Sequence, residues 1–319
     1  MQVLIVSPAP AGSRVGNRVT ALRFAGLLRR AGHRVRVRGA YEDLGEDLLI
    51  ALHARKSASA IEEARRARPG RPIVLVLTGT DVYGDIGRAP EADRSLELAD
   101  RLVILQPRAA EELPQAVRTK TRLVLQSAKA PPGPHTPDPE HFDVCVLAHL
   151  RPVKDPLLAA RAARGLPPSS RIRIRLVGGA LDEPSRAEAR AELARNPRLE
   201  WLGTLPRGRA LQVLASSRLL VLSSRNEGGP AAVTEAIACG LPVLSTRIPA
   251  AEGLLGAEHP GLYPPGDETA LRELLERCEG DPEFYERLRR RSLELLASVD
   301  PAREERDLIE LIAELTDGR

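Results

Sequence analysis

The first half of the chain alternates short aliphatic runs with amphipathic stretches. Runs of strand length occur at residues 3–6, 33–37, 48–52, 73–77, 102–105 and 123–125, and stretches of helical periodicity separate most of them, beginning with residues 18–30. Repeated strand, crossover helix and strand form a parallel sheet with helices on both faces, and such sheets bind ligands at the carboxyl ends of their strands. The pattern therefore predicts an α/β domain over residues 1–130.

The same rhythm resumes after a proline-rich interruption. Prolines stand at positions 131, 132, 134, 137 and 139, and because proline cannot donate to a sheet, residues 131–140 are predicted to be a linker. New aliphatic runs at 144–147, 172–176, 199–201, 219–222 and 242–244 predict a second parallel-sheet domain over 141–298. We expect a ligand in the cleft between two such domains.

The last segment, 299–319, is predicted to be a helix. Its apolar residues Leu308, Ile309, Ile312 and Leu315 form one stripe, which is typical of a helix that buries one face. We expect this helix to pack back on the first domain.

Composition narrows the class of protein. The 319 residues suit two domains, and the 3% aromatic content argues against the stacking platforms of single-stranded nucleic-acid binders. The net charge of +4 fits anionic small molecules. Three cysteines without paired spacing, Cys145, Cys239 and Cys278, favour reduced thiols and a cytoplasmic location. The longest apolar runs have five residues, so no membrane span is predicted.

The strongest chemical signal follows the run that ends at Leu222. Gly228 and Gly229 precede Pro230, which suits the first turn of a helix. Backbone N–H groups there would meet an anion such as a diphosphate at a positive helix end. Glu227 and Glu235 flank this turn, and a carboxylate accepts two hydroxyl hydrogen bonds at once, as a ribose or sugar diol requires. Each acid alone is better explained as a helix-start or solvated charge, and only the whole string favours a ligand site.

Glu227, seven residues, Glu235 and then Ala-Ile-Ala-Cys-Gly-Leu-Pro-Val-Leu resemble the donor-site motif of family 4 glycosyltransferases of the GT-B fold. The resemblance implies an α/β chain of two Rossmann-like domains that binds a UDP-sugar. It also implies that Glu235 holds the ribose, that Glu227 holds the donor sugar and contributes to catalysis, and that Gly203, Thr204 and Leu205 lie near the nucleobase.

A second part of the resemblance concerns cations. Arg151 and Lys154, in His149-Leu-Arg-Pro-Val-Lys-Asp-Pro156, match the family's catalytic pair that neutralises the departing diphosphate. Two fixed cations stabilise that developing charge without a metal. The chain contains no Asp-x-Asp sequence, so neither a metal nor another cofactor is expected.

In the first domain, Gly16 and Asn17 open the helix after the first strand and are candidate donor ligands. His53 and Asp81 follow the third and fourth strands and are candidate catalytic residues, although a lone histidine such as His53 is equally well explained as a core residue. The candidate acceptor residues share positions near these strand ends: Arg14, Arg18, Arg55, Lys56, Thr78, Gly79 and Thr80.

Four segments resemble a narrower branch, the selenosugar synthases of selenoneine biosynthesis. They are Thr78-Gly-Thr-Asp-Val-Tyr-Gly-Asp-Ile86, the cation motif at 149–156, Glu227-Gly-Gly, and Arg247-Ile-Pro with Gly253-Leu-Leu-Gly256. This resemblance implies transfer of a sugar from UDP-N-acetylglucosamine to selenophosphate with formation of a carbon–selenium bond. A trianionic acceptor would explain the basic residues of the first domain.

Three alternatives remain open at this point. The first is a family 4 glycosyltransferase that acts on a lipid or polysaccharide precursor, which would share every donor residue. The second is a UDP-sugar epimerase. The third is a UDP-sugar sensor without catalysis.

Overall fold

The computed structural model describes residues 1–10, 12 and 16–316, and the chain forms two compact units. Unit 1 comprises Met1–Gln126 together with the C-terminal segment from Ala302, and unit 2 comprises Ser127–Pro301. Residues 124–141, which include the five clustered prolines, contain neither helix nor strand.

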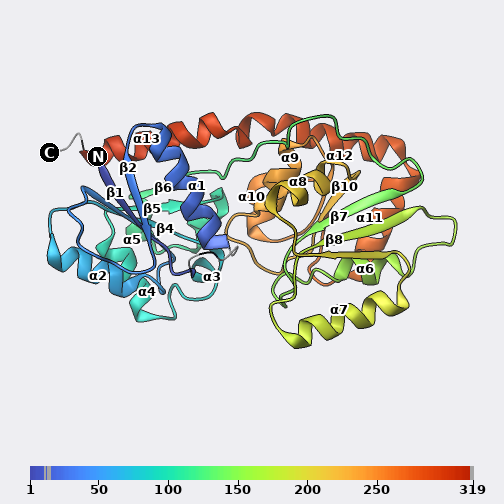
Figure 1. Cartoon of the computed structure of the whole chain (residues 1–319), viewed down its shortest axis with the longest axis horizontal. Helices are drawn as coiled ribbons and strands as arrows, with labels where there is room; N and C mark the ends of the chain where they lie inside the picture. The colour runs from blue at the N-terminus through green and yellow to red at the C-terminus, as the bar shows by residue number, and fades with distance from the viewer. Residues whose placement is uncertain (11, 13–15, 317–319) are drawn as a thin grey trace. The chain divides into compact units, whose positions relative to one another are not determined.

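Unit 1 is built on a six-stranded parallel sheet (Figure 1). The spatial order of its strands is β2-β1-β3-β4-β5-β6. The strands are β1 (Gln2–Val6), β2 (Arg34–Arg38), β3 (Leu48–Leu52), β4 (Ile73–Val76), β5 (Arg101–Ile104) and β6 (Thr121–Leu123). The helices are α1 (Gly16–Arg30), α2 (Ala58–Ala67), α3 (Gly79–Val82), α4 (Pro90–Leu98), α5 (Gln115–Arg118), α13 (Pro301–Thr316) and the 3₁₀ turn η1 (Pro107–Glu112).

Helices cover both faces of this sheet. Strand residues such as Leu4 and Leu75 pack with α2 and α4, and Ile5 and Val74 pack with α1 and α13. Figure 1 shows these two helix layers on opposite sides of the strands. Every residue of β3 is buried, as expected for a central strand between two helix layers.

The C-terminal helix α13 buries a slightly different stripe from the predicted one. Leu308, Leu311 and Ile312 are buried in the core with α1, whereas Ile309 is exposed. The prediction of Ile309 as a core residue was therefore wrong, because a buried face spaced at i, i+3 and i+4 from Leu308 selects Leu311 and Ile312.

Unit 2 repeats the architecture with the strand order β12-β11-β10-β7-β8-β9, again wholly parallel. The strands are β7 (Phe142–Leu147), β8 (Ile172–Val177), β9 (Leu199–Gly203), β10 (Leu219–Leu222), β11 (Val243–Thr246) and β12 (Leu262–Tyr263). The helices are α6 (Leu158–Ala163), α7 (Glu183–Arg195), α8 (Arg207–Ala215), α9 (Ala231–Ala238), α10 (Pro249–Leu255), α11 (Glu268–Gly280), α12 (Pro282–Glu294) and η2 (Leu296–Val299).

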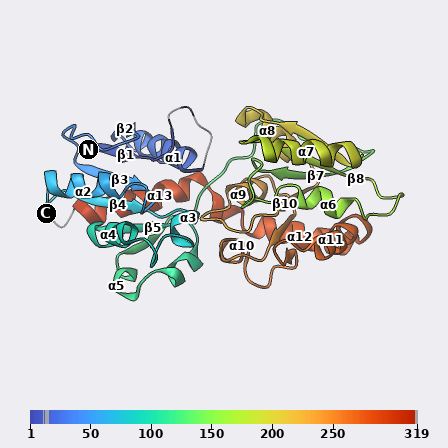
Figure 2. The same ribbon diagram turned by 90° about the horizontal axis from the view of Figure 1, so that it is seen from below.

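One face of this second sheet packs on α6, α11 and α12, and the other packs on α8, α9 and α10. Figure 2 shows the same helices from below. On the second face, the apolar strand residues come from β7, β10, β11 and β12. The part of that face formed by β8 and β9 instead carries Arg173, Arg175 and Glu200.

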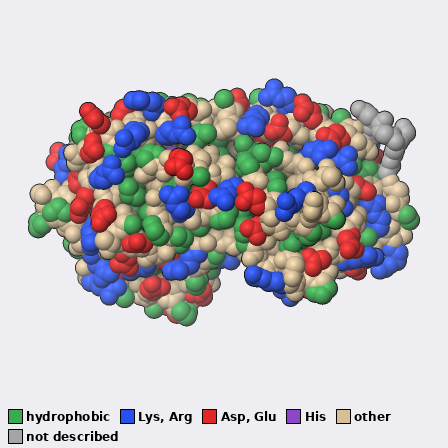
Figure 3. Space-filling model, turned by 180° about the vertical axis from the view of Figure 1, so that it is seen from behind, with side chains coloured by type: hydrophobic (Ala, Val, Ile, Leu, Met, Phe, Trp, Pro, Cys, Tyr) green, Lys and Arg blue, Asp and Glu red, His purple; other side chains and the backbone are tan. Residues whose placement is uncertain are grey.

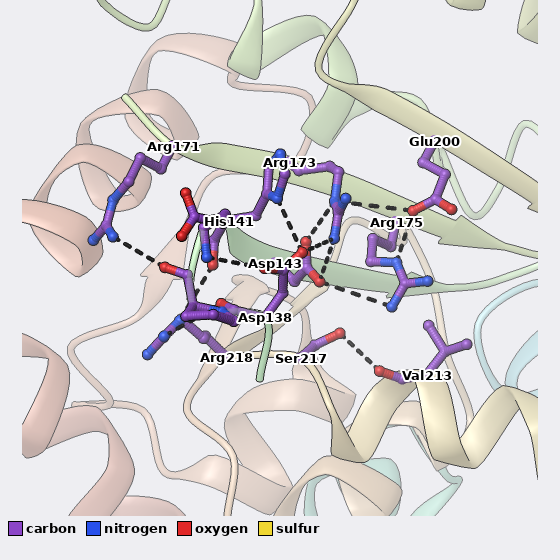
Figure 4. Close-up of polar contacts among 12 residues, drawn as sticks. Asp138, His141, Asp143, Arg171, Arg173, Arg175, Glu200, Val213, Ser217 and Arg218 are labelled. Carbon is purple, nitrogen blue, oxygen red and sulfur yellow. Dashed lines mark hydrogen bonds and ion pairs between the residues drawn. The ribbon is translucent and has the colours of Figure 1, made fainter. Parts of the chain in front are cut away.

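These charges form a network around Asp143, which is almost fully buried (Figure 4). Arg173 donates from Nε to Oδ1 at 2.7 Å and from Nη2 to Oδ2 at 2.8 Å. Arg175 lies 3.8 Å from the same carboxylate and pairs with Glu200 at 2.8 Å. A buried carboxylate is tolerated when it is held by a bidentate guanidinium, so the charges on this part of the sheet satisfy one another.

The outer surface is charged but mixed. On the face shown in Figure 3, basic and acidic side chains are interspersed and form no single-sign field. Among the described residues, no helix is long and apolar enough to cross a membrane.

Candidate active site

The sheet topology indicates where a ligand would bind in each unit. In unit 1 the strand order reverses at β1, with β2 on one side of it and β3 on the other. In unit 2 it reverses at β7, with β8 on one side and β10 on the other. At such a switch point the loops beyond the carboxyl ends of the two strands separate and leave a crevice. In unit 2 the flanking loops follow β7 and β10 and comprise residues 148–157 and 223–230. In unit 1 they follow β1 and β3.

In unit 2 the switch point brings Lys154 and Glu227 together. The ammonium of Lys154 pairs with Glu227 Oε1, and Ser224 Oγ donates to the same oxygen at 2.7 Å. The Glu227 side chain is 10% exposed and that of Lys154 is 27% exposed. Two of the predicted catalytic residues thus form one polar cluster that solvent reaches only partly.

Arg151 lies in the same loop but is not part of this cluster. Its side chain is exposed, and its backbone carbonyl accepts from the N–H groups of Lys154 and Asp155 at 2.9 and 3.2 Å. These two bonds form the turn that carries Lys154, whereas the guanidinium of Arg151 has no hydrogen bond or ion pair with another residue that the structure describes.

Glu235 lies on α9, the helix that follows the glycine turn. Its side chain is 7% exposed, and one oxygen is 2.7 Å from Nη2 of Arg207, whose side chain is 58% exposed. The predicted ribose carboxylate therefore has a cation beside it. Helix α9 begins at Ala231, and Pro230 is its N-cap, so the proline directly precedes the first turn instead of lying in it. Gly228 and Gly229 are half-buried just before it.

The predicted nucleobase segment lies at the end of β9, where glycines allow close packing. A Cβ at Gly178 would lie 1.8 Å from the Ala148 carbonyl oxygen, and one at Gly179 would lie 2.1 Å from Thr204 Oγ1. Trp201 Nε1 donates to the Gly178 carbonyl at 2.8 Å. Gly203, with φ of 65°, Thr204 and Leu205 are thus held beside the ends of β7 and β8.

In unit 1, His53 and Asp81 lie together at the carboxyl ends of β3 and β4. His53 Nδ1 is 3.9 Å from Asp81 Oδ2 and accepts from the Lys56 N–H at 3.4 Å, while Nε2 is 3.0 Å from Thr80 Oγ1. Burial lowers the pKa of His53 to about 4, so the ring is neutral at pH 7. Because Nδ1 accepts, Nε2 carries the proton and acts as a donor.

Asp81 is completely buried and holds the local backbone. Its carboxylate accepts from the backbone N–H groups of Ala54 at 2.8 Å, Thr78 at 2.7 Å and Val82 at 3.1 Å. Burial raises the pKa of Asp81 to about 6, and the hydrogen bonds from Ala54 and Thr78 oppose that rise. This environment is that of a structural carboxylate at the start of α3, since its hydrogen bonds come from backbone N–H groups and from Thr78 Oγ1.

A hollow of about 390 Å³ opens beside His53. Its lining consists of His53, Arg55, Lys56, Thr80, Asp85 and Glu91. Arg55 is not a free cation there, because its guanidinium pairs with Asp85 at 3.2 Å and with Glu91 at 3.0 Å. Lys56, in the loop after β3, is exposed, whereas Thr78 and Gly79, which follow β4, are buried and half-buried.

Four further candidates belong to the segment that follows β1. Gly16 and Asn17 are the first two residues of α1, with Gly16 exposed and Asn17 half-buried. The Nε atom of Arg18 is buried and makes no hydrogen bond with another described residue. Arg14 lies outside the described residues.

No metal site is evident in the part of the chain that the structure describes, where no three His, Cys, Asp or Glu residues group together. Cys145 and Cys278 are buried and Cys239 is half-buried. Burial raises the pKa of the Cys145 and Cys278 thiols to about 12, so these two thiols are protonated at neutral pH.

Sequence reasoning missed four polar residues of these sites: Ser224, Arg207, Asp155 and Asp85. Asp155 and Asp85 stand inside quoted motifs, and Ser224 lies three residues before Glu227, so these polar side chains were an available signal. Arg207 follows a proline at a helix start, where a cation is disfavoured. Its pairing with Glu235 is a tertiary contact that no sequence spacing reveals.

Comparison with known proteins agrees with this architecture. The family of glycosyl transferases group 1 matches residues 132–294. The D-inositol 3-phosphate glycosyltransferase of Mycobacteroides abscessus is 31% identical over 144 residues, which is 42% of this chain and 32% of that protein. The match therefore spans about a third of that relative's length.

Two solved structures are similar over their whole length. HepE of Anabaena in complex with UDP and glucose has a TM-score of 0.74 at 18% identity and covers 100% of both chains. Sucrose-phosphate synthase of Thermosynechococcus elongatus has a TM-score of 0.80 at 16% identity and covers 100% of this chain and 99% of that one. The predicted GT-B architecture is thereby confirmed. Because the family match extends over more than half of its residues, the chain belongs to the glycosyl transferases group 1 family.

Proposed function

We propose that the chain transfers a sugar from a UDP-sugar, with the donor held by unit 2. The observation that carries this proposal is the cluster of Lys154, Ser224 and Glu227 at the switch point of the second sheet. Lys154 would bind phosphate, and Glu227 beside it would bind sugar hydroxyls. Glu235, on the helix α9 that follows this loop, would bind the ribose. The complex of HepE with UDP and glucose, a protein of the same fold, supports this choice of donor.

The proposed chemistry needs charge stabilisation at the leaving group. As the bond between the anomeric carbon and the diphosphate oxygen breaks, its electron pair departs with UDP. Lys154 and Arg151 would neutralise that charge, together with the backbone N–H groups that precede α9. Glu227 would accept hydrogen bonds from sugar hydroxyls and so orient the anomeric carbon.

For the acceptor we propose selenophosphate, with UDP-N-acetylglucosamine as the donor. The four motif segments that resemble the selenosugar synthases support this assignment. In unit 1, the exposed residues Lys56 and Thr80 line the hollow in which a phosphate group would bind, and His53 Nε2–H donates to the Thr80 hydroxyl. Selenium would supply the electron pair of the new carbon–selenium bond, so no base is required, in keeping with the neutral donor role of His53.

One observation favours a second candidate, an acceptor that attacks through a hydroxyl group. Asp85 and Glu91 neutralise Arg55, so the hollow is far less basic than the sequence indicated. Carboxylates accept hydrogen bonds from hydroxyls and repel a trianion. Asp85 Oδ2 also lies 3.9 Å from His53 Nε2, where it would receive the hydroxyl proton.

Parallel incubations separate these candidates. The full chain is mixed with UDP-N-acetylglucosamine and with either selenophosphate or a sugar or inositol acceptor, and UDP release and product mass are followed in each. A product with the selenium isotope pattern, formed in step with UDP, supports the first candidate. UDP release that requires a sugar or inositol acceptor and ignores selenophosphate supports the second. Absence of UDP binding in calorimetry overturns the proposed donor itself.

A further inference from the structure

Asp155, directly after Lys154, has an unusual backbone conformation. Its φ is 41°, in the left-handed region, and His53 is the other non-glycine residue with positive φ in the described part of the chain. Left-handed backbone is unfavourable for a residue with a Cβ, and among such residues aspartate and asparagine tolerate it best. A strained residue beside a candidate catalytic lysine indicates that the surroundings hold it there for a reason.

The side chain of Asp155 is held from two sides. Oδ1 accepts from Arg161 Nη2 at 2.9 Å, and Oδ2 accepts from Arg225 Nη2 at 3.1 Å. The Asp155 side chain is only 11% exposed. Arg161 belongs to α6, Arg225 lies in the loop after β10, and Arg161 also pairs with Glu268 at the start of α11. One carboxylate thus links the Lys154 loop to three other segments of unit 2.

Two more bonds attach the same two loops to each other. The Arg225 N–H donates to the Val153 carbonyl at 2.8 Å, and Ser223 Oγ donates to the Lys154 carbonyl at 3.0 Å. These contacts join Val153 and Lys154 to the segment that precedes Glu227. The lysine and the glutamate therefore belong to two loops that hydrogen bonds hold together. Asp155 adds an ion pair between the same two loops through Arg225.

We infer that Asp155 is a positioning residue, which directs the Lys154 ammonium at the diphosphate through its left-handed backbone and its bonds to Arg161 and Arg225. A lysine carries a point charge on a flexible stem, so its direction is set by the backbone that bears it and by neighbouring contacts. Asp155 itself touches no substrate. The inference rests on the proposed UDP-sugar site and adds the device that orients its leaving-group cation.

Two substitutions separate the carboxylate from the backbone. Asp155→Asn retains a residue that tolerates positive φ but weakens both guanidinium bonds. Asp155→Gly relieves the backbone and removes both bonds. The matched control is Asp138→Asn, which makes the same chemical change in an ion-paired aspartate of the same unit, bonded to Arg173 at 3.1 Å and to His141 at 3.0 Å.

The readouts are UDP and uridine affinity by calorimetry, kcat with the donor, and thermal unfolding. We expect both Asp155 variants to lose UDP affinity about tenfold while uridine affinity stays unchanged. Their kcat is expected to fall on the order of 10- to 100-fold, because a displacement of about 1 Å has that effect on an oriented group. In a Lys154→Met background, Asp155→Asn is expected to cause no further fall in kcat.

Each result bears on one idea. If wild type binds no UDP, the proposed function fails before the inference is reached. If wild type binds UDP and Asp155→Gly matches it in kcat and affinity, the carboxylate has no positioning role and the inference fails. Equal losses for UDP and uridine, or an additive loss in the Lys154→Met background, would show general disorder of unit 2 and would also overturn it.

Discussion

The ammonium of Lys154 pairs with the carboxylate of Glu227 although the two residues are 73 positions apart in the sequence. Each belongs to a different loop at the carboxyl ends of the strands of unit 2, and Ser224 Oγ donates a hydrogen bond to the glutamate. In the free chain each of these charges is thus neutralised by a group that the proposed donor would engage. Substitution of either partner is therefore expected to affect the other, with opposite effects on UDP.

For this pair we predict that Lys154→Met weakens UDP binding and that Glu227→Gln strengthens it. Loss of the lysine removes the cation that meets the diphosphate, and loss of the glutamate charge frees that cation. Transfer is expected to fall in both, by about 10²- to 10³-fold for Lys154→Met. Calorimetry with UDP and initial rates with the UDP-sugar measure the two effects. Weaker UDP binding in both variants contradicts this account.

A second prediction concerns Glu235 and Arg207. Glu235→Gln is expected to abolish any preference for UDP over 2′-deoxy-UDP, since the carboxylate would no longer grip the ribose hydroxyls. Arg207→Gln is expected to weaken UDP binding less than fivefold, because an exposed ion pair contributes about 1 kcal/mol or less. Competition titrations with the two nucleotides measure this difference. An Arg207→Gln effect as large as that of Glu235→Gln would place Arg207 on the ligand instead.

The glycines after β8 give a stability prediction with an internal control. Gly178→Ala would place a methyl group 1.8 Å from the backbone oxygen of Ala148, which cannot move without displacing β7. We expect a loss of about 3 kcal/mol, the upper end of overpacking costs, in the free energy of unfolding of unit 2. Gly208→Ala, on α8 with nothing within 4 Å of the new methyl, is expected to be neutral or slightly stabilising. Urea denaturation followed by fluorescence of Trp201, the single tryptophan, measures both.

A fourth prediction concerns acid sensitivity. His259 is buried, and desolvation, with Arg291 nearby, lowers its pKa from 6.5 to about 4. The unfolded chain therefore binds a proton at this residue at higher pH than the folded chain does. Its contribution to stability is complete above pH 6.5 and declines towards pH 4, by up to about 3 kcal/mol.

His259→Gln removes this titration. Between pH 7 and pH 4.5 the wild type is expected to lose more stability than the variant, so the difference between them changes with pH. Trp201 fluorescence during urea denaturation reports on the correct unit. Parallel pH profiles for the two proteins would contradict the assignment.

The fifth prediction separates the two acceptor candidates in unit 1. With an anionic acceptor, Lys56→Met raises the acceptor KM, and Arg55→Met has a smaller effect because Arg55 is already paired. With a hydroxyl acceptor, Asp85→Asn lowers kcat, and Lys56→Met leaves the acceptor KM unchanged. UDP affinity serves as the control in each case, since these residues belong to unit 1 and the proposed donor site to unit 2.

The sequence predicted the fold class because aliphatic strands and amphipathic helices alternate regularly, and the comparisons confirmed it. It also placed Lys154 and Glu227 in one site through a family resemblance, which remains a prediction that binding experiments must test. Periodicity could not reveal that Arg55 is paired, since Asp85 and Glu91 reach it only through the packing of α3 and α4. Nor could it reveal the left-handed backbone of Asp155 or the bond from its carboxylate to Arg225, which lies 70 positions away.

The core of unit 1 contains Leu308, Leu311 and Ile312, which come almost last in the chain, whereas unit 2 is formed from one continuous stretch. During translation the ribosome therefore delivers all of unit 2 before the helix that seals the first sheet. Part of the apolar face of the first sheet therefore stays uncovered while the 175 residues of unit 2, Ser127–Pro301, are synthesised. Truncation near residue 300 would consequently impair the half of the protein that is synthesised first.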